Sequence, residues 1–169
     1  MNENLRILHK KIEHLVRMQA DVAHSVGKMS VPLQKIQCGG IDSLTLDERE
    51  TISAFTKRFS DYQEQLGKTM RSVAIEEESP VNPFGAILSL MEKLEILESS
   101  SKWKDIRELR NQAGHEYEDD VNELFQILSG MIEGTSYLSD VQARLQEFVA
   151  QNYKPLPSEP EIKFASPKC

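Results

Sequence analysis

The sequence predicts an all-α protein that folds as an up-and-down antiparallel bundle of four to five helices. Apolar residues recur at three- and four-residue steps in four segments, which is the period of an amphipathic helix. No segment shows the two-residue alternation that is typical of a half-buried strand. The chain has 169 residues, of which 39% are hydrophobic, and this is enough for one domain with its own core.

The first predicted helix covers residues 3–26, where apolar residues alternate with charged ones at the helical period, and Gly27 is expected to end it. Residues 27–44 are predicted to form a loop, because they contain Pro32 and the pair Gly39-Gly40.

The second predicted helix begins at a capping box, Thr45-Leu-Asp-Glu48. In this motif the Thr45 hydroxyl accepts a hydrogen bond from the Glu48 amide, and the Glu48 side chain reaches back to the Thr45 amide. The helix is expected to end at a break over residues 76–83. Its single apolar seam consists of Ile52, Phe55, Phe59, Tyr62, Leu66, Met70 and Val73.

A third helix is predicted after the break, with Asn82 as its cap and Pro83 at its first position. The serines at 99–101 interrupt this helix. A short helical piece then leads to Gly114, which is expected to be an end or a kink.

The last predicted helix starts at a second capping-box pattern, Asp120-Val-Asn-Glu123, and ends near Tyr153. The final 16 residues contain four prolines and are expected to form an extended or flexible tail. The predicted organisation is therefore one helical domain over residues 1–153 and a proline-rich tail over residues 154–169.

Charge and cysteine content exclude several classes of protein. The formal net charge of -7 argues against a surface covered with nucleic-acid phosphate contacts, although it leaves room for a local basic site. Cys38 and Cys169 form no CxxC pair, so neither a disulfide framework nor a thiolate metal site is expected. Because no apolar run approaches the roughly 20 residues of a membrane span and the N-terminus lacks a signal-peptide core, a cytoplasmic location is predicted.

Residues 110–117, Arg-Asn-Gln-Ala-Gly-His-Glu-Tyr, place an arginine, an amide, a histidine and a tyrosine at a predicted helix junction. An arginine stabilises negative charge on a phosphoryl group, and a histidine moves protons near neutral pH. Together Arg110 and His115 suit attack of a ribose 2′-hydroxyl on the neighbouring phosphate, which supplies its own nucleophile and needs no metal. Composition and spacing alone favour a helix-capping His115 beside a structural Arg110.

A basic cluster precedes this motif. Lys102, Lys104 and Arg107 lie within eight residues of Arg110 and are the predicted RNA contacts. Taken alone, such a charge run also fits a solvated helix face. Arg107 and Arg110 are three residues apart and would share one face of a helix.

The string Arg110-Asn111-Gln-Ala-Gly-His115-Glu-Tyr117 resembles the RxxxxHxY signature of HEPN-domain proteins, in particular the HepT-like toxins. The similarity is best over residues 84–132, and the remainder is matched by the number and order of helices. The resemblance implies a HEPN-like helical bundle that dimerises. It also implies an endoribonuclease of a toxin–antitoxin system, which cleaves RNA without a metal or cofactor and leaves a 2′,3′-cyclic phosphate.

Carried onto this chain, the resemblance gives each motif residue a role. Arg110 would hold the scissile phosphate or the attacking hydroxyl, His115 would transfer protons, and Asn111 would orient the site. Tyr117 matches the tyrosine that the antitoxin of HepT-like systems, a minimal nucleotidyltransferase, modifies with AMP. The implied partners are a second copy of the chain, such a nucleotidyltransferase and RNA, with no membrane.

Two other functions remain open at the level of sequence. The net charge of -7 and the acidic residues after Tyr117 also fit a non-catalytic binding module that pairs with a nucleotidyltransferase. The heptad-like apolar seams also fit a structural protein that forms a coiled-coil-like oligomer.

Overall fold

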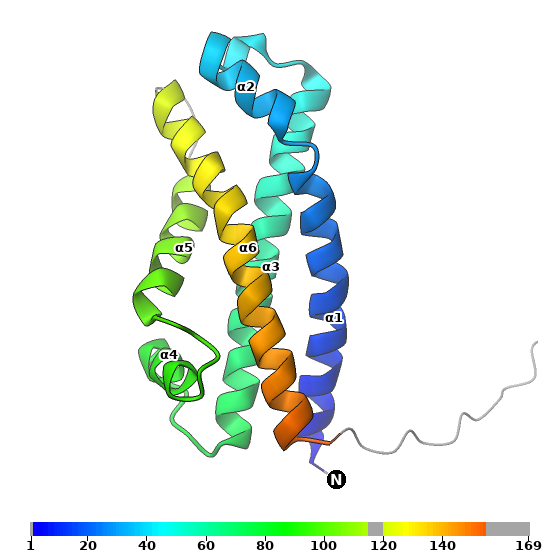
Figure 1. Cartoon of the computed structure of the whole chain (residues 1–169), viewed down its shortest axis with the longest axis vertical. Coiled ribbons are helices and arrows are strands. Elements are labelled where there is room, and N and C mark those ends of the chain that lie inside the picture. The colour runs from blue at the N-terminus through cyan, green and yellow to red at the C-terminus, as the bar shows by residue number, and fades with distance from the viewer. Residues whose placement is uncertain (1, 115–119, 155–169) are drawn as a thin grey trace, which may run out of the picture.

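The structure is a computed structural model that describes residues 2–114 and 120–154 (Figure 1). The described residues form six α-helices and one short 3₁₀ turn, and no strand is found among them, which confirms the all-α prediction. No helix in this part of the chain is long and apolar enough to span a membrane. The elements are α1 (Glu3–Val26), α2 (Ser30–Gly39), η1 (Ile41–Ser43), α3 (Leu46–Glu76), α4 (Phe84–Lys93), α5 (Ser100–Ala113) and α6 (Val121–Asn152).

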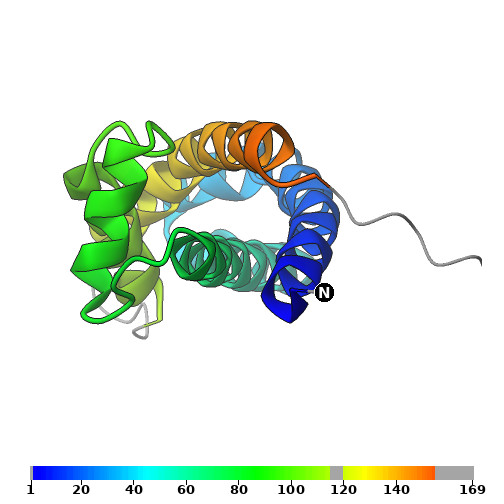
Figure 2. The same ribbon diagram turned by 90° about the horizontal axis from the view of Figure 1, so that it is seen from below.

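The helices form a bundle whose long members alternate in direction (Figure 1). α1 runs from one end to the other, α3 returns, α5 rises again and α6 returns. α2 crosses one end of the bundle, and α4 lies toward the opposite end. Figure 2 shows α1, α3 and α6 grouped together, with α4 and α5 beside them on one side.

The core is built from the apolar seams that the helical period predicts. All seven residues of the predicted α3 seam, from Ile52 to Val73, are buried. Removing such side chains from water is the main favourable contribution to folding. A polar layer crosses this core, where the Tyr62 hydroxyl donates to Gln142 and the Gln142 amide donates to Gln19. Burial raises the pKa of Tyr62, so its hydroxyl stays protonated and continues to donate.

The predicted loop over residues 27–44 is wrong, because most of it is α2 and η1. Pro32 is the third residue of α2, and the first amides of a helix have no partner within the helix, so the missing N–H costs no bond. Gly39 and Gly40 end this helix, since Gly40 is its C-cap with a φ of 73°, which a glycine adopts readily. Pro32 and Ile36 are buried, so α2 is held by packing against the bundle.

Both predicted helix starts that involve hydroxyl or carboxylate caps are confirmed. The Glu48 amide donates to the Thr45 hydroxyl at 3.1 Å, and the Thr45 amide donates to the Glu48 carboxylate at 2.8 Å. At α6 the Asp120 carboxylate accepts from the amides of Asn122 at 2.9 Å and Glu123 at 3.2 Å. These bonds satisfy amides that the first turn of each helix leaves unpaired.

The start of α4 differs from the prediction by one residue. Pro83 is the N-cap, no side chain caps this helix, and Phe84 is its first residue. Pro83 has an extended ψ of 170°, which lies outside the helical region, so it cannot be the first helical residue.

Two glycines of α6 determine how closely α5 approaches it. A Cβ atom at Gly134 would lie 2.7 Å from Cδ1 of Ile106, and one at Gly130 would lie 3.1 Å from Cδ1 of Leu109. Both distances are shorter than ordinary van der Waals contacts, so the absence of side chains allows α5 to lie against α6. The same turn of α5 carries Arg107 and Arg110.

Candidate functional site

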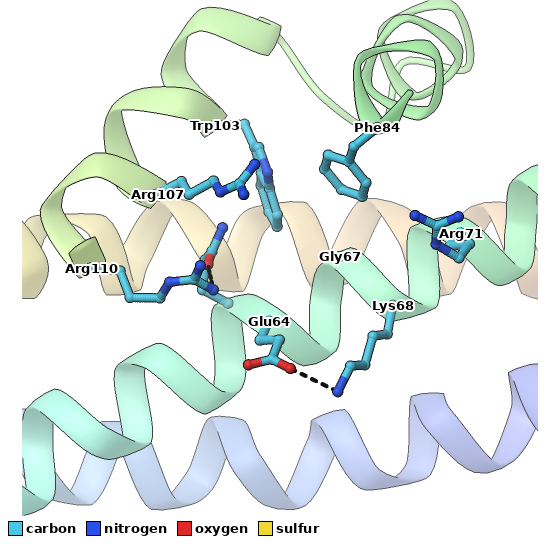
Figure 3. Close-up of a pocket in the computed structure, with 9 residues that line it drawn as sticks. Glu64, Gly67, Lys68, Arg71, Phe84, Trp103, Arg107 and Arg110 are labelled. Carbon is cyan, nitrogen blue, oxygen red and sulfur yellow. Dashed lines mark hydrogen bonds and ion pairs between the residues drawn. The ribbon is translucent and has the colours of Figure 1, made fainter. Parts of the chain in front are cut away.

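A pocket of about 380 Å³ opens between α3, α4 and α5 (Figure 3). Its volume falls in the range of about 300–1,000 Å³ that is usual for small-ligand sites. The residues that line it are Gln63, Glu64, Gly67, Lys68, Arg71, Phe84, Trp103, Arg107 and Arg110.

One face of α5 contributes Trp103, Arg107 and Arg110. These residues are four and then three positions apart, which is the spacing of neighbours on one helix face. Arg110 Nη1 donates to Gln63 Oε1 at 2.8 Å, and Gln63 is itself buried in α3. The guanidinium of Arg110 is therefore held in place by one bond and keeps further N–H groups for a ligand.

α3 contributes the opposite wall of the pocket. Lys68 forms an ion pair with Glu64, with 2.8 Å between Nζ and Oε1. The hydrogen bond that Lys68 donates to Glu64, and then the charges of Lys68 and Arg110, hold the pKa of Glu64 below its ordinary value. Glu64 is thus ionised at neutral pH. Arg71 Nη1 donates to the carbonyl of Val81 at 2.9 Å, which fixes a third guanidinium at the rim.

The pocket is positively charged although the whole chain is acidic. Four cationic side chains line it, and the one carboxylate among the lining residues is the Glu64 that Lys68 already binds. Arg107 is exposed and makes no hydrogen bond or ion pair within residues 2–114 and 120–154. Guanidinium groups bind phosphates through paired N–H donors, so this arrangement favours a phosphate-bearing ligand.

Two aromatic side chains complete the pocket. Figure 3 shows the rings of Phe84 and Trp103 directed toward Gly67, with Arg71 on one side and Arg107 and Arg110 on the other. A Cβ atom at position 67 would lie 3.5 Å from Cζ of Phe84 and 3.7 Å from Cζ2 of Trp103. Because Gly67 has no side chain, both rings reach the backbone of α3.

The structure separates the residues that the sequence predicts for this site. Arg110 and Arg107 line the pocket together, while Asn111 is exposed at the end of α5 and Lys104 is exposed outside the pocket. Lys102 lies over the ring of Tyr137, with 4.7 Å between its Nζ and the ring centroid. Its ammonium group also lies 3.9 Å from the carboxylate of Glu98, and Lys102 is not among the residues that line the pocket.

Two predicted residues, the proton-transfer residue His115 and the modification site Tyr117, lie outside the described residues. The residue before them in the described chain is Gly114, the C-cap of α5. Their predicted roles therefore stay predictions.

The sequence pattern does not indicate Gln63, Lys68 and Arg71 as site residues. They lie on α3, about 40 residues before the motif, and their signal is weak because the polar face of any exposed helix contains such side chains. The spacing of Gln63, Gly67 and Arg71 places them on one helix face, but only the packing of α3 beside α5 relates that face to Arg110.

The part of the chain that the structure describes contains no group of three or more His, Cys, Asp or Glu residues arranged to hold a metal ion. Comparisons of the chain with protein-family models, with curated proteins and with solved structures give no significant match.

Proposed function

We propose that this protein is a HepT-like, metal-independent endoribonuclease. The observation that carries the proposal is the position of Arg110. This arginine opens the motif at residues 110–117 and lines a cationic pocket in a chain whose net charge is -7. A guanidinium in that position is suited to bind a phosphodiester and to stabilise the charge that develops on it.

The proposed reaction is an internal transfer within RNA. The ribose 2′-oxygen attacks the adjacent phosphorus atom, the bond from phosphorus to the 5′-oxygen breaks, and a 2′,3′-cyclic phosphate forms. The proton of the 2′-hydroxyl leaves to a base, and a proton reaches the departing 5′-oxygen. His115 is the proposed proton carrier, because an imidazole both accepts and donates protons near neutral pH. Arg110 is proposed to hold the phosphate, and Asn111 is proposed to orient it.

Under this proposal the activity is regulated by a partner enzyme. A minimal nucleotidyltransferase would join the Tyr117 oxygen to the α-phosphorus of ATP and release pyrophosphate. The added AMP would bring bulk and negative charge to the motif that Arg110 opens, and this charge would repel an RNA backbone. Two copies of the chain would bring two motifs, and so two arginines, to one phosphate.

The direct test is cleavage of a single-stranded RNA by the purified chain in the presence of a chelator, with analysis of the product ends. We expect 2′,3′-cyclic phosphate ends, and loss of cleavage by roughly 100-fold or more in Arg110→Gln and His115→Ala. The matched control is Arg49→Gln, an exposed arginine of α3 outside the pocket. Thermal unfolding of each variant reports whether the bundle is intact.

Full activity of His115→Ala would show that the assignment of this residue is wrong. RNA that stays intact at high protein concentration, together with co-purification of a nucleotidyltransferase, would instead favour the non-catalytic binding module.

Modification is tested separately by mass spectrometry of the intact protein after co-expression with a candidate nucleotidyltransferase. The proposal expects a mass gain in steps of one AMP, located at Tyr117. A mass gain at another residue would contradict the assignment of Tyr117.

A further inference from the structure

We propose that the pocket between α3, α4 and α5 binds one nucleotide unit of an RNA strand, with its two flanking phosphates at Arg107 and at Arg71, on opposite sides of the rings, and its base against Phe84. The identification of the strand as RNA rests on the proposed function. The binding itself requires no cleavage, and it extends the site from the motif at the end of α5 to residues of α3 and α4 that no motif includes.

The three arginine side chains of the pocket are not paired with a carboxylate among the described residues. Arg71 and Arg110 each use one N–H group on a neutral partner, the carbonyl of Val81 and the side chain of Gln63. Neither bond neutralises a positive charge. Arg107 has no described partner, so none of the three guanidinium groups forms an ion pair within the described residues. A phosphate that contacts these guanidinium groups would supply the negative charge that they lack.

The aromatic side chains indicate that the ligand is more than a free phosphate. Phe84 is half-buried at the first residue of α4, and Figure 3 shows its ring beside Arg71 inside the pocket. Basic grooves with aromatic side chains are the usual sites for single-stranded nucleic acid, where the bases stack on the rings. The volume of about 380 Å³ is that of a small-ligand site, which a base and its phosphate would fill.

A buried donor inside the pocket has no partner. Trp103 is about 1% exposed, and its Nε1 makes no hydrogen bond to any described residue. The edge of the indole that carries Nε1 also carries Cζ2, the atom that faces Gly67. Because an unpaired buried N–H group is unfavourable, an acceptor on a bound base or sugar would stabilise this position.

Trp103 is also the single tryptophan of the chain, so its fluorescence reports on this pocket alone. The experiment titrates the full chain with a short single-stranded RNA in which every 2′-oxygen is methylated, so that it cannot be cleaved. Adenosine monophosphate and inorganic phosphate are titrated in parallel. We expect a saturable change in fluorescence with the RNA, and binding at least about tenfold weaker for each of the two small ligands.

Two arginine variants test the residues, and one serves as a control. Arg107→Gln removes no bond within the described residues and should leave folding unchanged, yet weaken RNA binding about tenfold. Arg71→Gln should have a similar effect. The matched control Arg49→Gln, on the same helix as Arg71 but outside the pocket, should bind as the unchanged protein does.

Several results would overturn the inference. Labelled RNA that binds, by fluorescence anisotropy, without any change in Trp103 fluorescence would place the RNA elsewhere. Equal RNA binding by Arg107→Gln and Arg49→Gln would exclude a role for Arg107 in binding. Inorganic phosphate that binds as tightly as the RNA would exclude a role for the base.

Cleavage of unmethylated RNA separates this inference from the proposed function. Binding at Trp103 without cleavage would support the nucleotide site and refute the endoribonuclease. Cleavage with no change in Trp103 fluorescence, and with no effect of Arg107→Gln, would support the endoribonuclease and refute the nucleotide site.

Discussion

Glu78 and Glu95 have left-handed backbone angles, with φ values of 53° and 58°. Each residue follows the end of a helix, and the next amide donates to the carbonyl five residues earlier, from Ser79 to Ala74 and from Ile96 to Met91, both at 2.9 Å. Such helix ends usually carry glycine. A side chain in this region costs roughly 1–2 kcal/mol, so both glutamates are held there by the fold around them.

Replacement of Glu95 by glycine is therefore expected to stabilise the protein. The free energy of unfolding of Glu95→Gly should rise by about 1 kcal/mol in urea denaturation, because the strain of the Cβ atom is removed. The control is Glu133→Gly, an exposed position inside α6, where glycine should lower the free energy of unfolding by about 1 kcal/mol. Equal destabilisation by both changes would show that Glu95 is unstrained.

At the scale of single residues, the sequence identified the chemistry of the site better than its geometry. Arg107 and Arg110 follow from their three-residue spacing, and both line the pocket. The bond from Arg110 to Gln63 could not be predicted, because nothing in either residue's neighbourhood records a partner 47 positions away. Lys102, a predicted RNA contact, lies over the ring of Tyr137, since an aromatic ring next to a helix face attracts an ammonium group.

Among the elements, the start of α3 brings two partners to one carboxylate. Glu48 closes the capping box with Thr45, and it also forms an ion pair with Lys35 of α2, with 2.7 Å between Nζ and Oε1. The hydrogen bond from Lys35, followed by the bond from the Thr45 amide, lowers the pKa of Glu48. This carboxylate therefore links the short helix α2 to the first turn of α3.

The pH dependence of stability follows from this lowered pKa. A carboxyl group whose pKa is lower in the folded chain stabilises it fully above the unfolded pKa of about 4.3, and this stabilisation is lost as the pH falls through the folded value. We expect Glu48→Gln to be less stable than the unchanged protein at pH 7. The difference should shrink toward pH 3, as measured by urea denaturation at both pH values. A difference that is the same at both would contradict the assignment.

The length of each helix decided what the sequence could predict. α1, α3 and α6 are long, and each repeats its apolar period many times, so their bounds were predicted almost to the residue. α2 has only ten residues, begins around a proline and ends in two glycines, which are also the residues of loops. Its helical form is established by the burial of Pro32 and Ile36, which depends on the rest of the bundle.

At the scale of the whole molecule, up-and-down helical order was predictable, because each long helix has one apolar seam and the connections are short. Which polar faces meet was not predictable. Lys68 and Arg71 of α3 line one pocket with Arg110 because α5 packs beside α3, and Gly130 and Gly134 let the same helix lie close to α6. The positive pocket of this acidic chain therefore forms only when its helices pack together.

The proposed function predicts that the active species is a dimer. Two copies would place two arginines at one phosphate, and the stabilisation of its developing charge would far exceed that from one exposed arginine. Sedimentation at a series of concentrations should show that cleavage per chain rises and falls with the dimer fraction. Cleavage at full rate by a sedimenting monomer would rule this out.

Both ends of the described chain are hydrogen-bonded to residues at the C-terminal end of α3. Asn2 donates to the Glu76 carboxylate at 2.8 Å, and the Tyr153 hydroxyl donates to Glu77. Figure 1 shows α1 beginning and α6 ending at this same pole of the bundle. A mechanical load applied between residues 2 and 154 would meet these few contacts first. The helices would then separate one turn after another. A load between residue 2 and the end of the bundle that α2 crosses would instead act in shear along the full length of α1.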